Sequence, residues 1–138
     1  MLTHLLAPRV IARAHCDIPC GIYDPIAATI AASTVAKMVE KINALAAGPM
    51  DLAFGNSLTR FVQAKEEHAE KVKKEVLILW SDYFKAEHLA KHPSLHDIVW
   101  KTVKLASKNK QSVDATAAAE LQAAVKQVSD IFWETKKA

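Results

Sequence analysis

The two cysteines of the chain lie four residues apart, directly after a histidine. They are Cys16 and Cys20, and His15 precedes the first of them. In an intracellular protein, two cysteines this close together are less typical of a structural disulfide than of a redox or metal site. Three side chains of these types therefore indicate either a reversible thiol pair or a metal site.

A peptide bond cut directly before His15 would complete a set of metal donors. The free amine of His15 and the amide nitrogen of Cys16 would close one five-membered chelate ring, and the Cys16 nitrogen and sulfur would close another. The His15 ring nitrogen nearest the backbone could reach an axial position, and the Cys20 sulfur would complete the square. Two nitrogens and two thiolates in a plane suit Ni(II) or Cu(II), whereas a closed tetrahedral zinc site would need more side-chain ligands.

The residues between and after the cysteines favour a chain that turns back on itself. Pro19 fixes its own φ and restricts the residue before it to extended backbone, and Gly21 permits positive φ. We call residues 15–23 the hook, and it has little conformational freedom to lose on closing. Asp17 is expected to order the hook through hydrogen bonds. The alternative is that Asp17 is a solvent-exposed aspartate in a turn.

Composition indicates one compact helical domain. The chain has 138 residues with 51% apolar content and three glycines, and its apolar residues recur at three- and four-residue steps, which predicts an all-α fold.

The charge of the chain is nearly balanced once its first 14 residues are set aside. Arg9 and Arg13 lie in those residues, so the remainder carries 16 basic and 15 acidic residues. This balance predicts no nucleic-acid partner. No apolar run approaches the ~20 residues of a membrane span, so no membrane partner is expected.

Four apolar stripes predict four amphipathic helices with short connections. An antiparallel bundle is the simplest way to bury such stripes against one another. The first stripe is predicted to consist of Ala28, Ala31, Val35, Met38, Ile42 and Leu45, and the last of Ala118, Leu121, Val125, Val128 and Phe132. Only Lys65 interrupts the second stripe. The predicted helices run from Asp24 and Pro25 to just before Gly48 and Pro49, from near Asn56 or Ser57 to Tyr83, from Pro93 to the polar stretch 107–112, and from Asp114 to the end.

Three ordered runs resemble the nickel superoxide dismutase family. They are HCDIPCGIYDP (residues 15–25), LWSDYFK (residues 79–85) and IFWETKK (residues 131–137). The resemblance implies an all-α, antiparallel four-helix bundle with an N-terminal metal-binding hook, assembled as a homohexamer. It implies one nickel ion per subunit as cofactor, held by His15, Cys16 and Cys20, and disproportionation of superoxide to oxygen and hydrogen peroxide.

The resemblance also implies that residues 1–14 are a pro-segment. A dedicated processing protease would remove it in the cytoplasm, leaving residues 15–138 as the bundle domain. The apolar stretch of this leader is short and is broken by Pro8 and Arg9, unlike a secretory signal. Without the resemblance, an ordinary frayed terminus would explain the same residues.

By analogy with the family, Tyr23 and Tyr83 line the access to nickel, although Tyr23 could also be a packed anchor. The family braces its axial histidine with a glutamate and an arginine, and these positions are occupied here by Ala31 and His68. The His15 ring is then expected to form a hydrogen bond with His68, with Glu66 or Glu67, or with water. Such partners tune the basicity of a metal ligand.

Two other classes of function stay open at this point. One is a metallochaperone-like bundle that binds nickel or copper without turnover, and the other is a thiol redox protein that uses Cys16 and Cys20. The spacing of His88, His92 and His96 suggests another metal site, but Pro93 interrupts their helical register. Bundle core or subunit contact is expected for four aromatic residues, Trp80, Phe84, Phe132 and Trp133.

Overall fold

The computed structural model describes residues 21–137, and within that range the regular structure is helical, without strands. Because the connections are short, each long helix returns alongside its predecessor, as expected for a bundle. The elements are α1 (Ile26–Leu45), α2 (Leu52–Ile78), the π-helical turn η2 (Leu79–Tyr83), α3 (Ala86–Lys91), α4 (Leu95–Gln111) and α5 (Ala115–Lys137).

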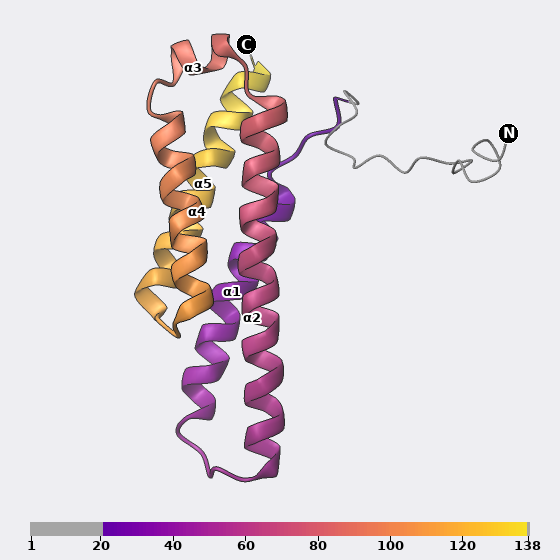
Figure 1. Ribbon diagram of the computed structural model, residues 1–138, viewed down its shortest axis with the longest axis vertical. Helices are drawn as coiled ribbons and strands as arrows, with labels where there is room; N and C mark the ends of the chain where they lie inside the picture. Colours follow the sequence, from indigo (N-terminus) through magenta and orange to yellow (C-terminus); the bar gives the residue numbers. More distant parts are fainter. Residues whose placement is uncertain (1–20, 138) are drawn as a thin grey trace, which may run out of the picture.

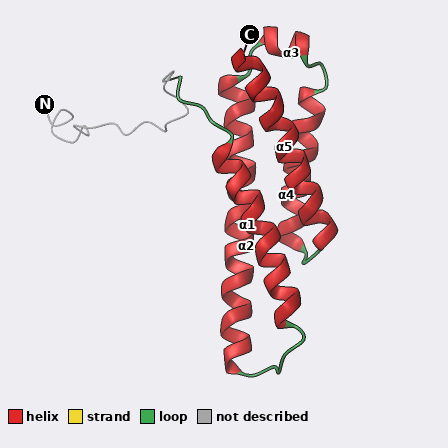
Figure 2. Cartoon of the chain, turned by 180° about the vertical axis from the view of Figure 1, so that it is seen from behind, coloured by secondary structure: helices red, strands yellow, loops and turns green. Residues whose placement is uncertain are grey.

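The four long helices form an antiparallel bundle, which confirms the predicted fold (Figures 1 and 2). α1 packs against α2 and α5, and α4 packs against the same two helices. The short helix α3 crosses one end of the bundle beside the C-terminal end of α5, and the α1–α2 turn lies at the opposite end (Figure 1). We call these the α3 end and the turn end. In the described part of the chain, no helix is long and apolar enough to cross a membrane.

Aspartates accept hydrogen bonds from backbone amides at the starts of α1, α2 and α5, and two of them, Asp24 and Asp114, are at predicted positions. The Asp24 carboxylate accepts a hydrogen bond from the Ile26 amide at 2.7 Å, just before α1. The predicted start of α2 near Asn56 or Ser57 is wrong, because α2 begins at Leu52. Asp51 caps it by accepting from the Phe54 amide at 2.8 Å, and a cap of this kind satisfies an amide that has no partner within the helix.

The core consists of the predicted stripes with small shifts in register. On α1, Val39 is buried where Met38 was expected, and Ala31 is completely buried. Phe84 and Phe132 are buried, whereas Trp80 and Trp133 are exposed to 39% and 45% and lie outside the core. All five predicted stripe positions of α5 are buried: Ala118, Leu121, Val125, Val128 and Phe132.

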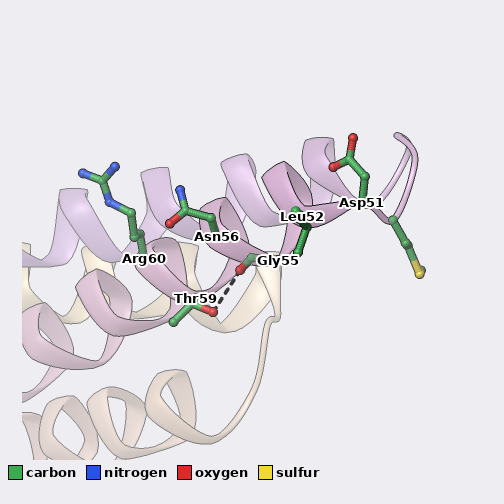
Figure 3. Close-up of a pocket in the computed structure, with 7 residues that line it drawn as sticks. Asp51, Leu52, Gly55, Asn56, Thr59 and Arg60 are labelled. Carbon is green, nitrogen blue, oxygen red and sulfur yellow. Dashed lines mark hydrogen bonds between the residues drawn. The ribbon is translucent and has the colours of Figure 1, made fainter.

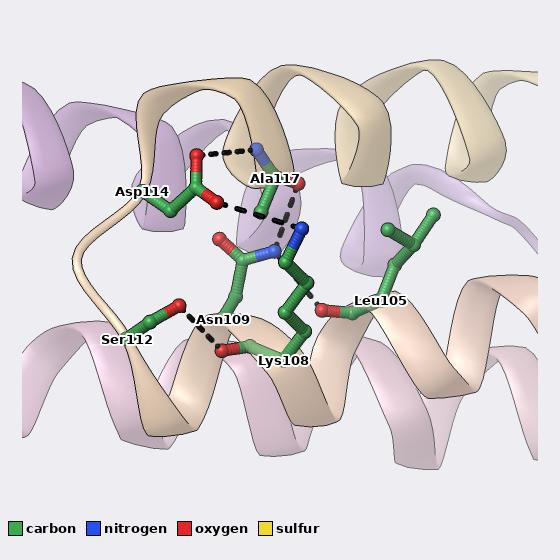
Figure 4. Close-up of polar contacts among 6 residues, drawn as sticks. All are labelled: Leu105, Lys108, Asn109, Ser112, Asp114 and Ala117. Carbon is green, nitrogen blue, oxygen red and sulfur yellow. Dashed lines mark hydrogen bonds and ion pairs between the residues drawn. The ribbon is translucent and has the colours of Figure 1, made fainter.

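The polar stretch 107–112, which was expected to end the third helix, instead lies mostly within α4. The reason is a buried asparagine. The Asn109 amide nitrogen donates to the Leu105 carbonyl at 3.0 Å and to the Ala117 carbonyl of α5 at 2.9 Å (Figure 4). Asn109 therefore fastens the end of α4 to the start of α5, where Asp114 accepts from the Ala117 amide at 3.0 Å.

The charged residue in the α2 stripe is buried with its amine paired. The Nζ of Lys65 donates to the carbonyl oxygens of Asn109 and, at 3.0 Å, of Lys110. These carbonyls lie at the end of α4, where helix carbonyls lack partners of their own. Desolvation lowers the pKa of Lys65, with the neighbouring Glu66 acting in the opposite direction. Lys65, which interrupts the apolar stripe, thus forms a polar contact between α2 and α4.

Candidate metal centre and its access

The side chains predicted to bind the metal are His15, Cys16 and Cys20, and those predicted to order the hook are Asp17 and Pro19. All five lie outside the described residues. Within residues 21–137, no three histidine, cysteine, aspartate or glutamate side chains gather closely enough to hold a metal ion. The second metal site suggested by the histidine spacing is therefore absent from that range. His96 instead accepts a hydrogen bond from the Trp80 indole at 2.8 Å.

The described part of the hook leads to the α3 end of the bundle. Gly21 has φ +71°, a conformation that other residues rarely adopt, so the predicted need for glycine is confirmed there. Two residues later, the Tyr23 ring centroid lies 5.6 Å from that of Tyr83, with the ring planes tilted by 53°. The two tyrosines predicted to line the metal access are therefore in contact.

Tyr83 is placed by a π-helical turn that the sequence pattern did not predict. The Phe84 amide donates to the Leu79 carbonyl five residues earlier, at 2.9 Å. A π turn inserts one residue into the helical repeat and changes the direction of the side chains that follow, and such turns are frequent at functional sites. The turn coincides with the first five residues of the LWSDYFK run.

Other elements enclose the Tyr83 ring on several sides. Its centroid lies 4.5 Å from that of Phe132 on α5 and 5.6 Å from that of His88 on α3, and the His88 ring is stacked at 22°. The Nζ of Lys136 lies 5.1 Å from the Tyr83 ring centroid, which is within the range of a cation–π contact. The Tyr83 hydroxyl lies 2.7 Å from the Thr135 hydroxyl oxygen.

A hollow of about 360 Å³ lies beside these rings. Both ammonium groups that line it, Lys85 and Lys136, are solvent-exposed, and a single carboxylate, Asp82, faces them. Two positive charges against one negative charge favour a small anion over a cation. The hollow is lined by Gly21, Tyr23, Asp82, Tyr83, Lys85, His88 and Lys136.

His68, which was expected to support His15, is half-buried at the edge of the α2 stripe. Its Nδ1 lies 2.8 Å from the Ala64 carbonyl oxygen. Because a carbonyl only accepts hydrogen bonds, Nδ1 must carry a proton, which leaves Nε2 as the nitrogen available to another partner. Ala31, which the resemblance places at the position of a family glutamate, packs in the core.

Several residues at the α3 end were not identified as site residues from the sequence. Thr135 and Lys136 belong to the IFWETKK run, but that run gave no indication that they contact Tyr83. His88 was considered only as a metal ligand. His92 directly follows α3, and its Nε2 lies 3.6 Å from the Oε2 of Glu134 on α5. This contact also holds the segment after α3 against α5.

A second hollow lies at the turn end, far along the bundle from these residues. Figure 3 shows its lining at the start of α2, with Asn56 and Arg60 on one side of the helix and Thr59 donating to the Gly55 carbonyl at 2.9 Å. Met50 and Leu52 beside it are exposed to 83% and 93%. None of the predicted site residues lines this hollow.

Comparison with known protein families gives a match over nearly the whole chain. The sequence profile described as nickel-containing superoxide dismutase matches residues 10–136. The superoxide dismutase [Ni] of Streptomyces coelicolor is 45% identical over 138 residues, and that of Streptomyces seoulensis is 43% identical over the same length. Each alignment covers all of this chain and all of the relative.

Solved structures agree with the sequence comparison. A native nickel superoxide dismutase structure has 44% identity and a TM-score of 0.78, and it is matched along its whole length by 90% of this chain. A nickel-containing superoxide dismutase with the nickel ligation of the oxidised state has 42% identity, a TM-score of 0.79 and the same coverage. Similarity at this level extends from the sequence to the arrangement of the helices.

Proposed function

This chain belongs to the nickel-containing superoxide dismutase family, and we propose that His15, Cys16 and Cys20 hold its nickel ion. The enzyme disproportionates superoxide to oxygen and hydrogen peroxide with nickel as cofactor. The observation that carries this conclusion is the family match over residues 10–136, together with full-length identity of 43–45% to two nickel superoxide dismutases.

The donor set of the hook fits nickel. Both cysteines of the chain are in it, and residues 21–137 contain no competing cluster of metal-binding side chains. Thiolates and nitrogen donors suit Ni(II) better than oxygen-rich sites do. Bound nickel supplies one-electron exchange with superoxide in both directions, and thiolate donors stabilise its higher oxidation state. One ion per subunit follows from one hook per chain.

The α3 end is proposed as the access to this centre. Lys85 and Lys136 attract the superoxide anion toward the hollow. The rings of Tyr23 and Tyr83, which contact each other there, restrict entry to small species and exclude larger reductants. Asp17 orders the hook through hydrogen bonds.

His68 is proposed to support His15 in place of the family's missing brace. With Nδ1–H donated to Ala64, its Nε2 is free to accept from, or to reach through water, the ring of His15. Pro19 limits the backbone conformations of the hook and so keeps the ligands close together. The histidine nearest the metal would then be oriented from α2 rather than from α1, where Ala31 is buried.

Residues 1–14 are proposed as a pro-segment that a protease removes in the cytoplasm. Support comes from the coverage of the comparisons: a curated relative aligns with all 138 residues, whereas the solved native chain corresponds to 90% of them. About a tenth of this chain therefore has no counterpart in that solved structure. A homohexamer is proposed for the processed subunit, and the exposed apolar side chains of Trp80, Trp100 and Trp133 supply surface for subunit contacts.

Nickel loading and superoxide decay test this proposal together. The chain beginning at His15 and the full chain would be loaded with nickel and compared at equal metal content. We expect turnover only from the chain beginning at His15, because an intact peptide bond removes the amine donor. Nickel binding without turnover in both forms would indicate a metal-binding bundle, and reversible oxidation of Cys16 with Cys20 without nickel binding would indicate a thiol redox protein.

A further inference from the structure

A chain of two hydrogen bonds connects Tyr83 to the last turns of α5. The hydroxyl oxygens of Tyr83 and Thr135 lie 2.7 Å apart, and the Thr135 hydroxyl lies 2.7 Å from the Phe132 carbonyl oxygen. The Tyr83–Thr135 distance alone leaves open which hydroxyl is the donor. The second bond decides the direction, because a carbonyl oxygen can only accept.

We propose that Thr135 is a positioning residue that fixes the direction of the Tyr83 hydroxyl proton. Thr135 has one hydroxyl proton, and it is donated to Phe132. Thr135 can therefore only accept from Tyr83, and Tyr83 must be the donor. The inference rests on the proposed role of Tyr83 at the metal access.

The surroundings of the Tyr83 ring hold this arrangement in place. The ring lies between Phe132 and the stacked ring of His88, and it also contacts the edge of Phe84 at 5.2 Å between centroids. A ring packed on several sides cannot rotate freely about its side-chain bonds. The hydroxyl oxygen is thus kept within reach of Thr135.

The direction of the proton determines how Tyr83 meets an anion. Tyr83 lines the access hollow, whereas Thr135 is not part of that lining. While the phenol proton is donated to Thr135, the Tyr83 oxygen can only accept hydrogen bonds from species in the hollow. Superoxide, an anion without a proton to donate, then gains no hydrogen bond from Tyr83 and passes it without being retained.

Ultraviolet resonance Raman spectroscopy can test the proton direction without nickel. The chain has two tyrosines, so in the Tyr23→Phe background the tyrosine signal comes from Tyr83 alone. The signal is a pair of ring-vibration bands, and the ratio of their intensities depends on whether the phenol hydroxyl donates or accepts a hydrogen bond. We expect a donor signature with Thr135 and with Thr135→Ser, and its replacement in Thr135→Val by the mixed signature of a phenol that both donates to and accepts from water in the hollow. Thr135→Ala serves as a second variant if valine prevents folding. A signature unchanged by both apolar variants, or an acceptor signature in the parent, would overturn the proposal.

Kinetics of the nickel-loaded enzyme give an independent test of the consequence. In Thr135→Val the freed phenol proton is expected to bind superoxide, which lowers KM about five- to tenfold and changes kcat less. Thr135→Ser should restore the parent value. The same valine substitution in a Tyr83→Phe background should have no effect on KM. An unchanged KM alongside a lost donor signature would overturn the role of Tyr83 in the access, whereas a KM change that persists without the Tyr83 hydroxyl would overturn positioning by Thr135.

Discussion

The rings of Tyr23 and Tyr83 are in contact, with centroids 5.6 Å apart, although Tyr23 is the last residue of the hook and Tyr83 ends the π turn after α2. This contact joins the exit of the hook to the α3 end of the bundle. The buried bundle core is formed by residues from Ala28 onward, and Tyr23 packs against it from outside. Changes in the ligands of the hook should therefore affect the metal without unfolding the helices.

Replacing Cys16 or Cys20 by serine is expected to abolish both stoichiometric nickel binding and superoxide turnover. A serine hydroxyl is too weakly acidic to replace a thiolate donor. Helical content, measured by circular dichroism, should remain that of the parent, because the described core contains no residue before Ala28. A serine variant that retains one nickel per subunit and normal superoxide decay would contradict the ligand assignment.

Replacing His68 by alanine is expected to slow turnover about tenfold or more while loosening nickel less, because groups that orient a ligand tune its basicity. Nickel content and superoxide decay would be measured on the same preparations. Lys71→Met, an exposed change on the same helix, is the matched control, and Glu67→Gln, also exposed, tests one of the two glutamates suggested as partners of His15. Turnover that falls with Glu67→Gln and not with His68→Ala would transfer the supporting role to Glu67.

Replacing Lys65 by methionine should lower the free energy of unfolding by about 1–3 kcal/mol, because it leaves buried carbonyls at the end of α4 without their donor. Methionine keeps similar length, so loss of packing is small. Denaturant titration of the apoprotein measures the effect. Lys74→Met, an exposed lysine on the same helix, is the control, and equal changes in the two variants would show that the contacts to Asn109 and Lys110 are unimportant.

The Asp114 cap should make stability depend on acid pH. Its bond from the Ala117 amide, with Lys108 nearby, holds the pKa of Asp114 below its usual value (Figure 4). A carboxyl group with a lowered pKa in the folded state binds its proton more weakly there than when unfolded. Its stabilisation is therefore complete above the unfolded pKa and is lost as pH falls through the folded pKa.

We accordingly expect Asp114→Asn, which keeps an acceptor for the cap but cannot titrate as a carboxyl, to be less sensitive to acid than the parent. Asp114→Ala should in addition be less stable at neutral pH, since the α5 amide loses its acceptor. Thermal unfolding between neutral pH and about pH 3 measures both effects. Parallel pH profiles for the parent and Asp114→Asn would show that another carboxyl group dominates.

The helical class, the bundle and most of the buried stripes could be predicted from the sequence. Periodicity of three and four residues identifies one face of a helix whatever that face meets, so the stripe of α5 was predicted at all five positions. The start of α2 was predicted too late, near Asn56 or Ser57, because the Asp51 cap, which lets the helix begin at Leu52, was not recognised. The metal ligands of the hook follow from their types and order, and they remain predictions.

Contacts between distant segments depended on the tertiary structure. In the sequence, Lys65 looks like an interruption of an apolar stripe and Asn109 like part of a polar stretch. Only the packing of α2 and α5 against α4 shows that carbonyl oxygens accept hydrogen bonds from both side chains. Thr135 is an unremarkable hydroxyl in the sequence. Its role became visible only when the π turn brought Tyr83 within 2.7 Å of it. Local periodicity encodes which face of a helix is buried, but the direction of a shared proton depends on which atoms the whole fold brings together.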